Sequence, residues 1–279
     1  YLHRCFEKHC ESLSYEQIVP FTDRCDYLAS MHMDHAYALT VEKLLDVELP
    51  ERVEYIRVIV AELQRIASHL MGIGFFLQDL GTLGTPLMYC FRLREKILDL
   101  FEMLCGARIT LSYMRPGGVL ADAPPDFWPA LDAFLDEFPS EFGEIEQLVL
   151  ENEIVMVRTR GVSTLPLAIA INSSVSGPVL RASGLAWDWR KMDPYDAYGD
   201  VEFDVPVAHA GDNYDRFWVR MQEVRQSIRI VQQCIQQIEP GSVRLELPLV
   251  LRAPSGAEAY GRAEASKGEL GFYLVSDGS

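Results

Sequence analysis

The stretch that decides the fold is Glu54–Leu77, EYIRVIVAELQRIASHLMGIGFFL. Its apolar residues return at steps of three and four, the spacing that places side chains on one face of an α-helix. The pattern lasts for about six turns, and Pro50 stands just before it, where a missing N–H costs a helix least. The sequence therefore predicts a long amphipathic helix with one buried face. The apolar positions are Ile56, Ile59, Val60, Leu63, Ile66, Ala67, Leu70, Ile73 and Leu77.

Three further segments show the same helical spacing. The first covers Ile97–Leu104 and is followed by Gly106, a residue type that commonly ends helices. The second covers Phe127–Val149. The third, Phe217–Ile238, alternates steps of four and three until Pro240-Gly241, a heptad pattern that predicts packing nearly parallel or antiparallel to a neighbour. We predict a mainly α fold, a helical bundle with small β elements near the termini.

Outside these helices the pattern changes. Residues 161–211 mix turns with acidic clusters and predict an irregular segment. Apolar residues alternate over Val243–Leu251, and together with Glu269–Val275 they predict a small sheet. We therefore expect a helical bundle core over residues 1–241, which includes the irregular segment, and a small β segment over residues 242–279 that is truncated at its C-terminus.

The amino-acid composition excludes several classes of protein. Of the 279 residues 49% are hydrophobic and 24% are charged, which excludes a disordered chain or a fibre. Lys and Arg number 25 against 41 Asp and Glu, and this net charge of −16 argues against nucleic-acid binding, which needs basic surface. No segment has the roughly 18 consecutive apolar residues of a membrane-spanning helix. Six scattered cysteines favour free thiols over a disulfide framework.

Self-contained motifs for nucleotide, metal or nucleophile sites are missing. The sequence has no phosphate-binding loop, nucleophile elbow, paired-histidine zinc motif or C-x-x-C pair. Gly72-Ile73-Gly74 lies inside a helical pattern and predicts close helix approach. His32 and His35 stand three residues apart, as metal ligands can, but no further ligand is near them in the sequence. We therefore predict no metal site in this chain.

Several polar residues stand on otherwise apolar helices. Glu62, Arg65 and His69 share one face of the first helix, and burial would require them to pair, in a structural ladder or a functional site. Asp79 follows at the helix end, where a carboxylate opposes the helix dipole, so it needs a partner or a role. Tyr27 offers a phenol that can donate a hydrogen bond without ionising, as a quinone carbonyl requires, although the residue taken alone favours a core tyrosine.

Short motifs occur along nearly the whole chain in a fixed order. They are Leu2–Lys8, Tyr55–Val58, Glu62–Ile66 with His69, Gln78–Gly81, Phe91–Glu95, Gly106–Arg108, Arg115–Val119, Gly177–Gly184, Pro194–Tyr198, Glu223–Ser227 and Gly268–Ser279. With these motifs the chain resembles the D subunit, of the 49 kDa type, of respiratory complex I (NADH:quinone oxidoreductase). That family is related to the [NiFe]-hydrogenase large subunit.

The resemblance implies a hydrogenase-large-subunit-like helical fold and the quinone-site subunit of the complex I peripheral arm. Such a subunit helps to reduce quinone with electrons from a [4Fe-4S] cluster held by the partner B subunit, in a reaction coupled to ion translocation. It would be an NADH:quinone oxidoreductase (translocase) subunit, active only within the complex. Its expected partners are the B subunit, the C subunit and the H subunit, which forms the quinone channel in the membrane. Its expected location is the cytoplasmic side of the cell inner (plasma) membrane, bound peripherally through these partners.

The resemblance also implies roles for individual residues. Tyr27 matches the tyrosine that hydrogen-bonds the quinone, and Asp79 the aspartate that pairs with a quinone-site histidine; both are expected to be catalytic. Arg4 and Arg24 match arginines near the partner's cluster, where positive charge would raise the potential of an anionic cluster. Thr110 stands where many members have a histidine, so a titratable group is lost there. The quinone-site histidine would lie upstream of the first residue, since we expect this sequence, which does not begin with Met, to be part of a longer chain.

Two alternatives stay open. A membrane-bound [NiFe] hydrogenase large subunit would need four cysteine ligands, including a C-x-x-C near Arg24. The segment Arg24-Cys25-Asp26-Tyr27 offers one thiol where two are needed. A non-catalytic scaffold for the cluster-bearing partner would need neither Tyr27 nor Asp79. Cys5 and Cys10, close to the expected cluster side, are predicted to be inert packing residues.

Overall fold

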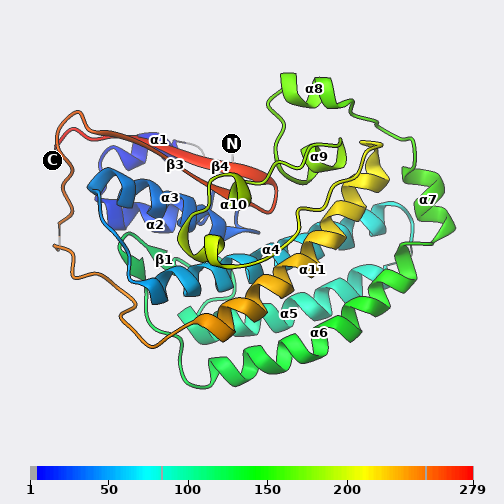
Figure 1. Ribbon diagram of the computed structural model, residues 1–279, viewed down its shortest axis with the longest axis horizontal. Coiled ribbons are helices and arrows are strands. Elements are labelled where there is room, and N and C mark those ends of the chain that lie inside the picture. The colour runs from blue at the N-terminus through cyan, green and yellow to red at the C-terminus, as the bar shows by residue number, and fades with distance from the viewer. Residues whose placement is uncertain (1–4, 83, 249, 279) are drawn as a thin grey trace.

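A long helix, α4 (Glu51–Asp79), runs through the centre of the computed structural model, which describes residues 5–82, 84–248 and 250–278 (Figure 1). Its buried positions extend from Val53 to Leu77, so the helix predicted from Glu54–Leu77 is confirmed. Helices α3, α5 and α11 all pack against it. The elements are α1 (Phe6–Cys10), α2 (Tyr15–Thr22), α3 (Ser30–Leu45), α4, α5 (Thr85–Cys105), β1 (Met114–Arg115), β2 (Gly118–Val119), α6 (Phe127–Val149), α7 (Glu153–Thr159), α8 (Leu167–Asn172), α9 (Gly177–Ala182), α10 (Trp189–Met192), the 3-10 helix η1 (Asp196–Asp200), α11 (Asn213–Gln237), β3 (Glu258–Ala265) and β4 (Gly268–Val275).

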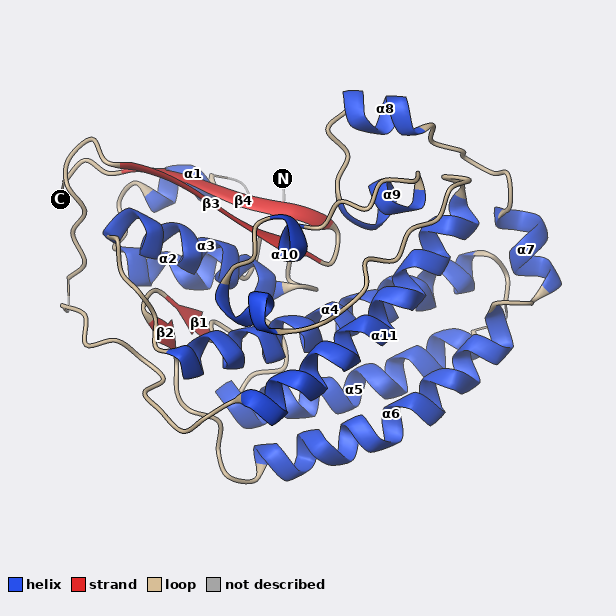
Figure 2. Cartoon of the chain, in the orientation of Figure 1, coloured by secondary structure: helices blue, strands red, loops and turns tan. Residues whose placement is uncertain are grey.

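Helices α5 and α6 extend the bundle on one side of α4 (Figure 2). Helix α5 approaches α4 closely at Gly74, where a Cβ atom would lie 2.9 Å from Leu87 Cδ1 and 3.3 Å from Cys90 Cβ. The close helix approach predicted for Gly72-Ile73-Gly74 is therefore confirmed at Gly74, whereas a Cβ atom at Gly72 would meet nothing within 4 Å. Gly106, with a φ of 71°, ends α5 in the left-handed conformation, as its position predicted.

The heptad face of α11 lies in the core. Its residues Phe217, Met221, Val224 and Val231 are buried and belong to the same hydrophobic cluster as the apolar faces of α4 and α5. Helix α11 packs along α4, as the heptad pattern predicted (Figure 1). These two helices form the part of the bundle that positions the candidate site.

The strands near the C-terminus form one antiparallel hairpin, in which Glu258 pairs with Val275 and Ala265 with Gly268. Strand β3 lies on helix α3, and Gly261 makes the approach possible, since a Cβ atom there would lie 2.7 Å from the Cα of Thr40. The strand predicted over Glu269–Val275 is therefore confirmed. The turn of this hairpin projects toward the start of α11 (Figure 2).

The strand predicted over Val243–Leu251 was wrong. In the described part of this segment only Arg244 forms a β-bridge, with Gly118. The neighbouring strand β2 is two residues long and offers a short edge, and Pro248 has no N–H to donate to a ladder. The described part of the segment is therefore irregular, with Leu247 N–H donating to the Leu245 carbonyl oxygen at 3.0 Å.

The predicted fold class is confirmed: the chain is mainly helical, with a small sheet near its C-terminus. The segment 161–211 holds three short α-helices, a 3-10 helix and their connecting loops. The division into residues 1–241 and 242–279 stays a prediction. No helix in the described ranges is both long and apolar enough to cross a membrane.

Candidate functional site

The residues predicted for the site lie on two elements. Tyr27 is on the loop between α2 and α3 and is 48% exposed. Asp79 is the last residue of α4 and is exposed. Arg24 lies on the Tyr27 loop, where it donates to the Pro20 carbonyl and has Nη1 3.8 Å from Asp23 Oδ2. Arg4 lies outside the described residues.

A cavity of about 360 Å³ lies between α4, the start of α11 and the β3–β4 turn; we call it the α4–α11 pocket. Its walls combine apolar and polar side chains. The rings of Phe76 and Phe217 stack at a centroid distance of 5.9 Å. The lining residues are Ser68, His69, Gly72, Ile73, Phe76, Asn213, Arg216, Phe217, Arg220, Ser266 and Lys267.

Two features connect this pocket to the predicted residues. Lys267, on the hairpin turn, has Nζ 2.6 Å from Asp26 Oδ2, and Asp26 directly precedes Tyr27. On α4, Gly72, Phe76 and Asp79 are spaced by four and then three residues, so Asp79 continues the helix face that lines the pocket. The pocket thus lies beside the Tyr27 loop and shares a helix face with Asp79.

Behind the pocket lies a buried ionic network centred on Glu62. Its carboxylate accepts hydrogen bonds from Tyr198 and Ser227, each at 2.6 Å. Arg65 Nε is 3.2 Å and Arg190 Nη1 3.1 Å from the same carboxylate. Burial alone would raise the pKa of Glu62, but the two guanidinium groups and the two hydroxyl donors hold that pKa well below its usual range. The predicted pairing of Glu62 with Arg65 is confirmed.

His69 belongs to both the pocket and the network. Its Nε2 is 2.7 Å from Glu223 Oε2, and Glu223 Oε1 is 2.7 Å from Arg181 Nη2. Burial lowers the pKa of His69, while the Glu223 carboxylate opposes that shift. His69 therefore pairs with a residue 154 positions away rather than with Glu62 or Arg65. The helix spacing contained no signal for this partner.

Arg216, Arg220 and Lys267 also line the pocket and were not predicted from the sequence. The spacing of four between the two arginines places them on one face of α11, next to Phe217, which is the one signal for them in the sequence. Lys267 stands just before the Gly268 motif, and only the folded hairpin brings it to the pocket.

The positions of the cysteines and histidines concern the prediction that this chain holds no metal site. No group of three or more His, Cys, Asp and Glu side chains is arranged to hold a metal ion in the described ranges. His35 Nε2 is 2.5 Å from Asp196 Oδ2, and the buried ring of His32 has no hydrogen-bond partner in the described part of the chain. Cys25 is a free thiol, as are the other five cysteines. That this chain binds no metal stays a prediction.

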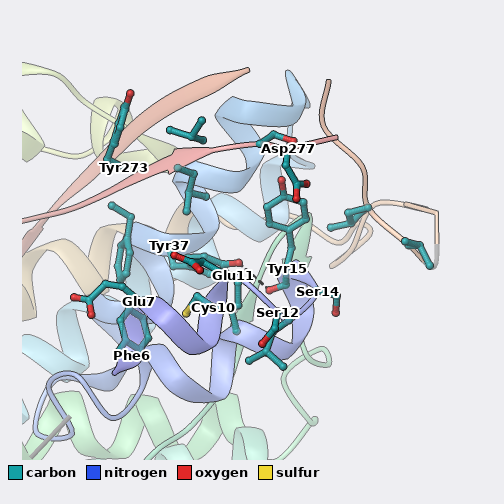
Figure 3. A pocket seen from close by; sticks show the side chains of 18 residues that line it. Phe6, Glu7, Cys10, Glu11, Ser12, Ser14, Tyr15, Tyr37, Tyr273 and Asp277 are labelled. Carbon is teal, nitrogen blue, oxygen red and sulfur yellow. Dashed lines mark hydrogen bonds between the residues drawn. The ribbon is translucent and has the colours of Figure 1, made fainter. Parts of the chain in front are cut away.

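A larger cavity, of about 870 Å³, lies between the α1–α2 region and β4 (Figure 3). Tyr15, Tyr37 and Tyr273 contribute to its wall, and Glu7 and Glu11 give it an acidic rim. Its described lining residues include none from α4 or from the Tyr27 loop. We therefore take the α4–α11 pocket as the candidate site.

Comparison with known proteins identifies the family of this chain. A family model described as "Respiratory-chain NADH dehydrogenase, 49 Kd subunit" matches residues 79–255. The chain is 55% identical to the D subunit of NADH-quinone oxidoreductase from Dehalococcoides mccartyi, over all of this chain and 76% of that protein. It is 50% identical to a D subunit of the same oxidoreductase from Roseiflexus sp., over all of this chain and 76% of that protein. For the D subunit from Chlorobaculum tepidum the identity is 49%, over all of this chain and 71% of that protein. The chain therefore belongs to the family of the 49 kDa subunit of the respiratory-chain NADH dehydrogenase.

Proposed function

We propose that this chain is the quinone-site subunit in the peripheral arm of an NADH-quinone oxidoreductase, and that the α4–α11 pocket receives the quinone headgroup. The observation that carries this proposal is the position of the pocket, joined to the Tyr27 loop by the Lys267–Asp26 ion pair and to Asp79 by a shared helix face. Family membership supplies the reaction class, since the relatives are named as D subunits of NADH-quinone oxidoreductase.

The pocket suits a quinone headgroup in size and chemistry. A volume of about 360 Å³ lies within the range of small-ligand sites. A quinone ring is flat and apolar on both faces, and Ile73 and the stacked rings of Phe76 and Phe217 offer matching apolar walls. Its two carbonyl oxygens need hydrogen-bond donors. Tyr27 is not among the described lining residues, but its loop adjoins the pocket through the Lys267–Asp26 ion pair, and its hydroxyl is the proposed donor.

The proposed role of this chain is to position the quinone headgroup and the groups around it. Tyr27 donates a hydrogen bond to one quinone carbonyl and orients the ring. Asp79 orients a histidine of the upstream family segment toward the ring. Arg24, exposed on the Tyr27 loop, faces the B subunit, whose [4Fe-4S] cluster supplies the electrons. Charge changes at this site are then coupled to ion translocation in the membrane arm.

The proposed partners are those of the family. The B subunit would cover the Tyr27 loop, with the C subunit beside it and the membrane-embedded H subunit below the quinone pathway. Attachment to the cytoplasmic side of the inner membrane would come through these partners. No described helix is able to span a membrane, which agrees with peripheral attachment.

Replacing Tyr27 by Phe in the assembled complex tests the proposal. We expect quinone-analogue binding to weaken by about tenfold, equivalent to about 1.4 kcal/mol, because one hydrogen bond to the headgroup is lost. Titration of a fluorescent or radiolabelled analogue measures this change. Tyr89→Phe is the matched control, because Tyr89 lies on α5 and does not line the pocket.

The outcomes separate the possible functions. Equal binding by wild type and Tyr27→Phe would place the headgroup elsewhere. Absence of binding in the wild-type complex would favour the alternative function, a scaffold for the cluster-bearing partner.

A further inference from the structure

The α4–α11 pocket carries a strongly positive lining in a negatively charged protein. The net charge of the chain is −16, yet Arg216 and Arg220 line the pocket. Lys267 lines it as well, but its charge is paired with Asp26. No Asp or Glu is among its described lining residues. The local charge is therefore opposite in sign to that of the chain as a whole, and it acts on whatever occupies the cavity.

The two arginines are held in place by neutral groups. Arg220 Nη1 donates to the Arg216 carbonyl oxygen at 2.8 Å. Arg216 donates to the Gly211 carbonyl oxygen at 2.6 Å and to the Ser163 carbonyl oxygen at 2.9 Å. Within the described ranges, neither guanidinium forms an ion pair with a carboxylate. Backbone carbonyl oxygens and the side-chain oxygen of Asn213 thus fix the geometry of the two groups without a direct carboxylate partner.

The nearest acidic groups are already engaged. Glu223 binds His69 and Arg181, and Asp212 and Asp215 accept backbone N–H groups at the start of α11. Burial lowers the pKa of Arg220, and the neighbouring Arg216 adds to that shift while Glu223 opposes it. Burial likewise lowers the pKa of Arg216, while Asp212 and Asp215 oppose that shift. Burial is the largest cause of both shifts, so an anion placed directly against the two guanidinium groups would offset part of the cost of their desolvation.

The apolar wall limits the kind of anion. Ile73, Phe76 and Phe217 form a surface that a small hydrated ion would not cover, whereas an aromatic ring would pack against it. A ligand that satisfies both parts of the pocket is flat, aromatic and negatively charged. The hydroquinone monoanion, which forms when a quinone gains two electrons and one proton, has this chemistry.

We propose that the α4–α11 pocket binds the reduced, anionic form of the quinone headgroup more tightly than the neutral quinone, through Arg216 and Arg220. This inference rests on the proposed function, in which the partner's [4Fe-4S] cluster supplies the electrons one at a time. One proton from solvent joins the two electrons to give the monoanion, and a second proton from solvent completes the neutral hydroquinone, so atoms and charge balance. Fixed cations stabilise charge that develops during reduction without having to reorganise, so the pocket favours reduction of its ligand.

A pair of matched ligands tests this preference in the assembled complex. One is a hydroxynaphthoquinone that is ionised at neutral pH, and the other is its neutral methyl ether, so the two share the same rings. We expect the anion to bind about tenfold more tightly than the ether at low salt, and the difference to shrink as salt is added. The comparison in the wild-type complex requires no substitution and therefore does not depend on how a variant folds.

Substitutions in α11 test whether Arg220 produces the preference for the anionic ligand. Arg220→Gln should reduce the preference to about twofold or less, whereas Arg220→Lys should keep most of it because the charge remains. Arg229→Gln is the control, since Arg229 lies on the same helix outside the pocket and pairs with Asp204 on the surface.

The outcomes distinguish this inference from the proposed function. Equal binding of the two ligands by wild type, with both weakened in Tyr27→Phe, would overturn the anion preference and leave the quinone site in place. A preference that survives in Arg220→Gln and disappears in Arg229→Gln would also overturn it. Binding of neither ligand would overturn the proposed function and this inference together.

Discussion

Glu62 shows how a single residue organises the buried polar centre. Its carboxylate is fully enclosed and receives two hydroxyl donors and two guanidinium groups from four different segments of the chain. Removing water from a carboxylate is costly, and only this complete set of partners offsets that cost. The network therefore specifies how α4, α10, η1 and α11 fit together.

Glu62→Gln keeps the side-chain size and removes the charge. We expect the free energy of unfolding to fall by about 3–5 kcal/mol, because Arg65 and Arg190 lose their shared counter-charge. Urea unfolding of the purified chain at neutral pH measures the change. Since the folded pKa of Glu62 is depressed, its contribution is present above the ordinary value of 4.5 and is lost as the pH falls below it. Glu62→Gln should therefore lack the part of the acid-induced loss of stability that comes from protonation of Glu62.

Glu144→Gln provides the comparison for a surface pair. Glu144 is 3.3 Å from Arg92, and both side chains are about half exposed, so its loss should cost no more than about 1 kcal/mol. Equal costs for Glu62→Gln and Glu144→Gln would contradict the role given to the buried network.

The pKa of Asp34 is shifted upward, in the direction opposite to that of Glu62. It is fully buried, accepts from Thr22 Oγ1 at 2.9 Å and faces the buried carboxyl of Asp23. Burial and the Asp23 carboxyl raise the pKa of Asp34 well above its ordinary value of 3.8. Its contribution to stability is therefore complete below that ordinary value and is lost as the pH rises through the raised folded pKa.

Asp34→Asn should remove this pH dependence, because an amide stays neutral, accepts from Thr22 and can donate to Asp23. We expect the difference in melting temperature between about pH 5 and about pH 8 to be smaller in the variant than in wild type. Thermal unfolding followed by circular dichroism measures it. An unchanged difference would mean that Asp34 does not hold a proton in the folded chain.

At the scale of elements, the β3–β4 hairpin depends on helix α3. A two-stranded hairpin alone is only marginally stable in water, so its packing on a helix must stabilise it. Gly261 permits that packing, because its missing side chain lets β3 reach the backbone of Thr40. The same packing holds the turn with Lys267 at the α4–α11 pocket.

Gly261→Ala should therefore destabilise the chain by about 1–3 kcal/mol, through a clash with backbone that cannot move freely. Gly143→Ala is the matched control on α6, where an added Cβ meets nothing within 4 Å and a helical alanine should stabilise by about 0.5–1 kcal/mol. Urea unfolding of both variants gives the comparison. A neutral Gly261→Ala would show that β3 does not need its close approach to α3.

At the scale of the whole molecule, the parts that could be predicted are those governed by local spacing. The four long helices, the stop at Gly106 and the close approach at Gly74 all follow from short-range patterns that burial then reinforces. Over Val243–Leu251 the same reasoning failed, because alternation cannot tell a paired strand from irregular chain beside a two-residue strand.

The candidate site was less predictable, because distant segments build it. Tyr27 and Asp79 were named from the family resemblance, and their roles stay predictions. The pairing of His69 with Glu223 and the arrival of Lys267 at the pocket depend on tertiary packing, which no local pattern encodes. Arg216 and Arg220 stand on a polar stretch of an amphipathic helix, where solvent-facing arginines are the ordinary expectation.

The most direct test of the central claim is to map where a photoreactive quinone analogue attaches in the assembled complex. After illumination, digestion and mass spectrometry, we expect label on the α4 segment 68–79 or the α11 segment 213–220, with unlabelled quinone competing for both. Label confined to the α1 and β4 residues of the larger cavity, or to other subunits alone, would contradict the assignment of the α4–α11 pocket as the quinone site.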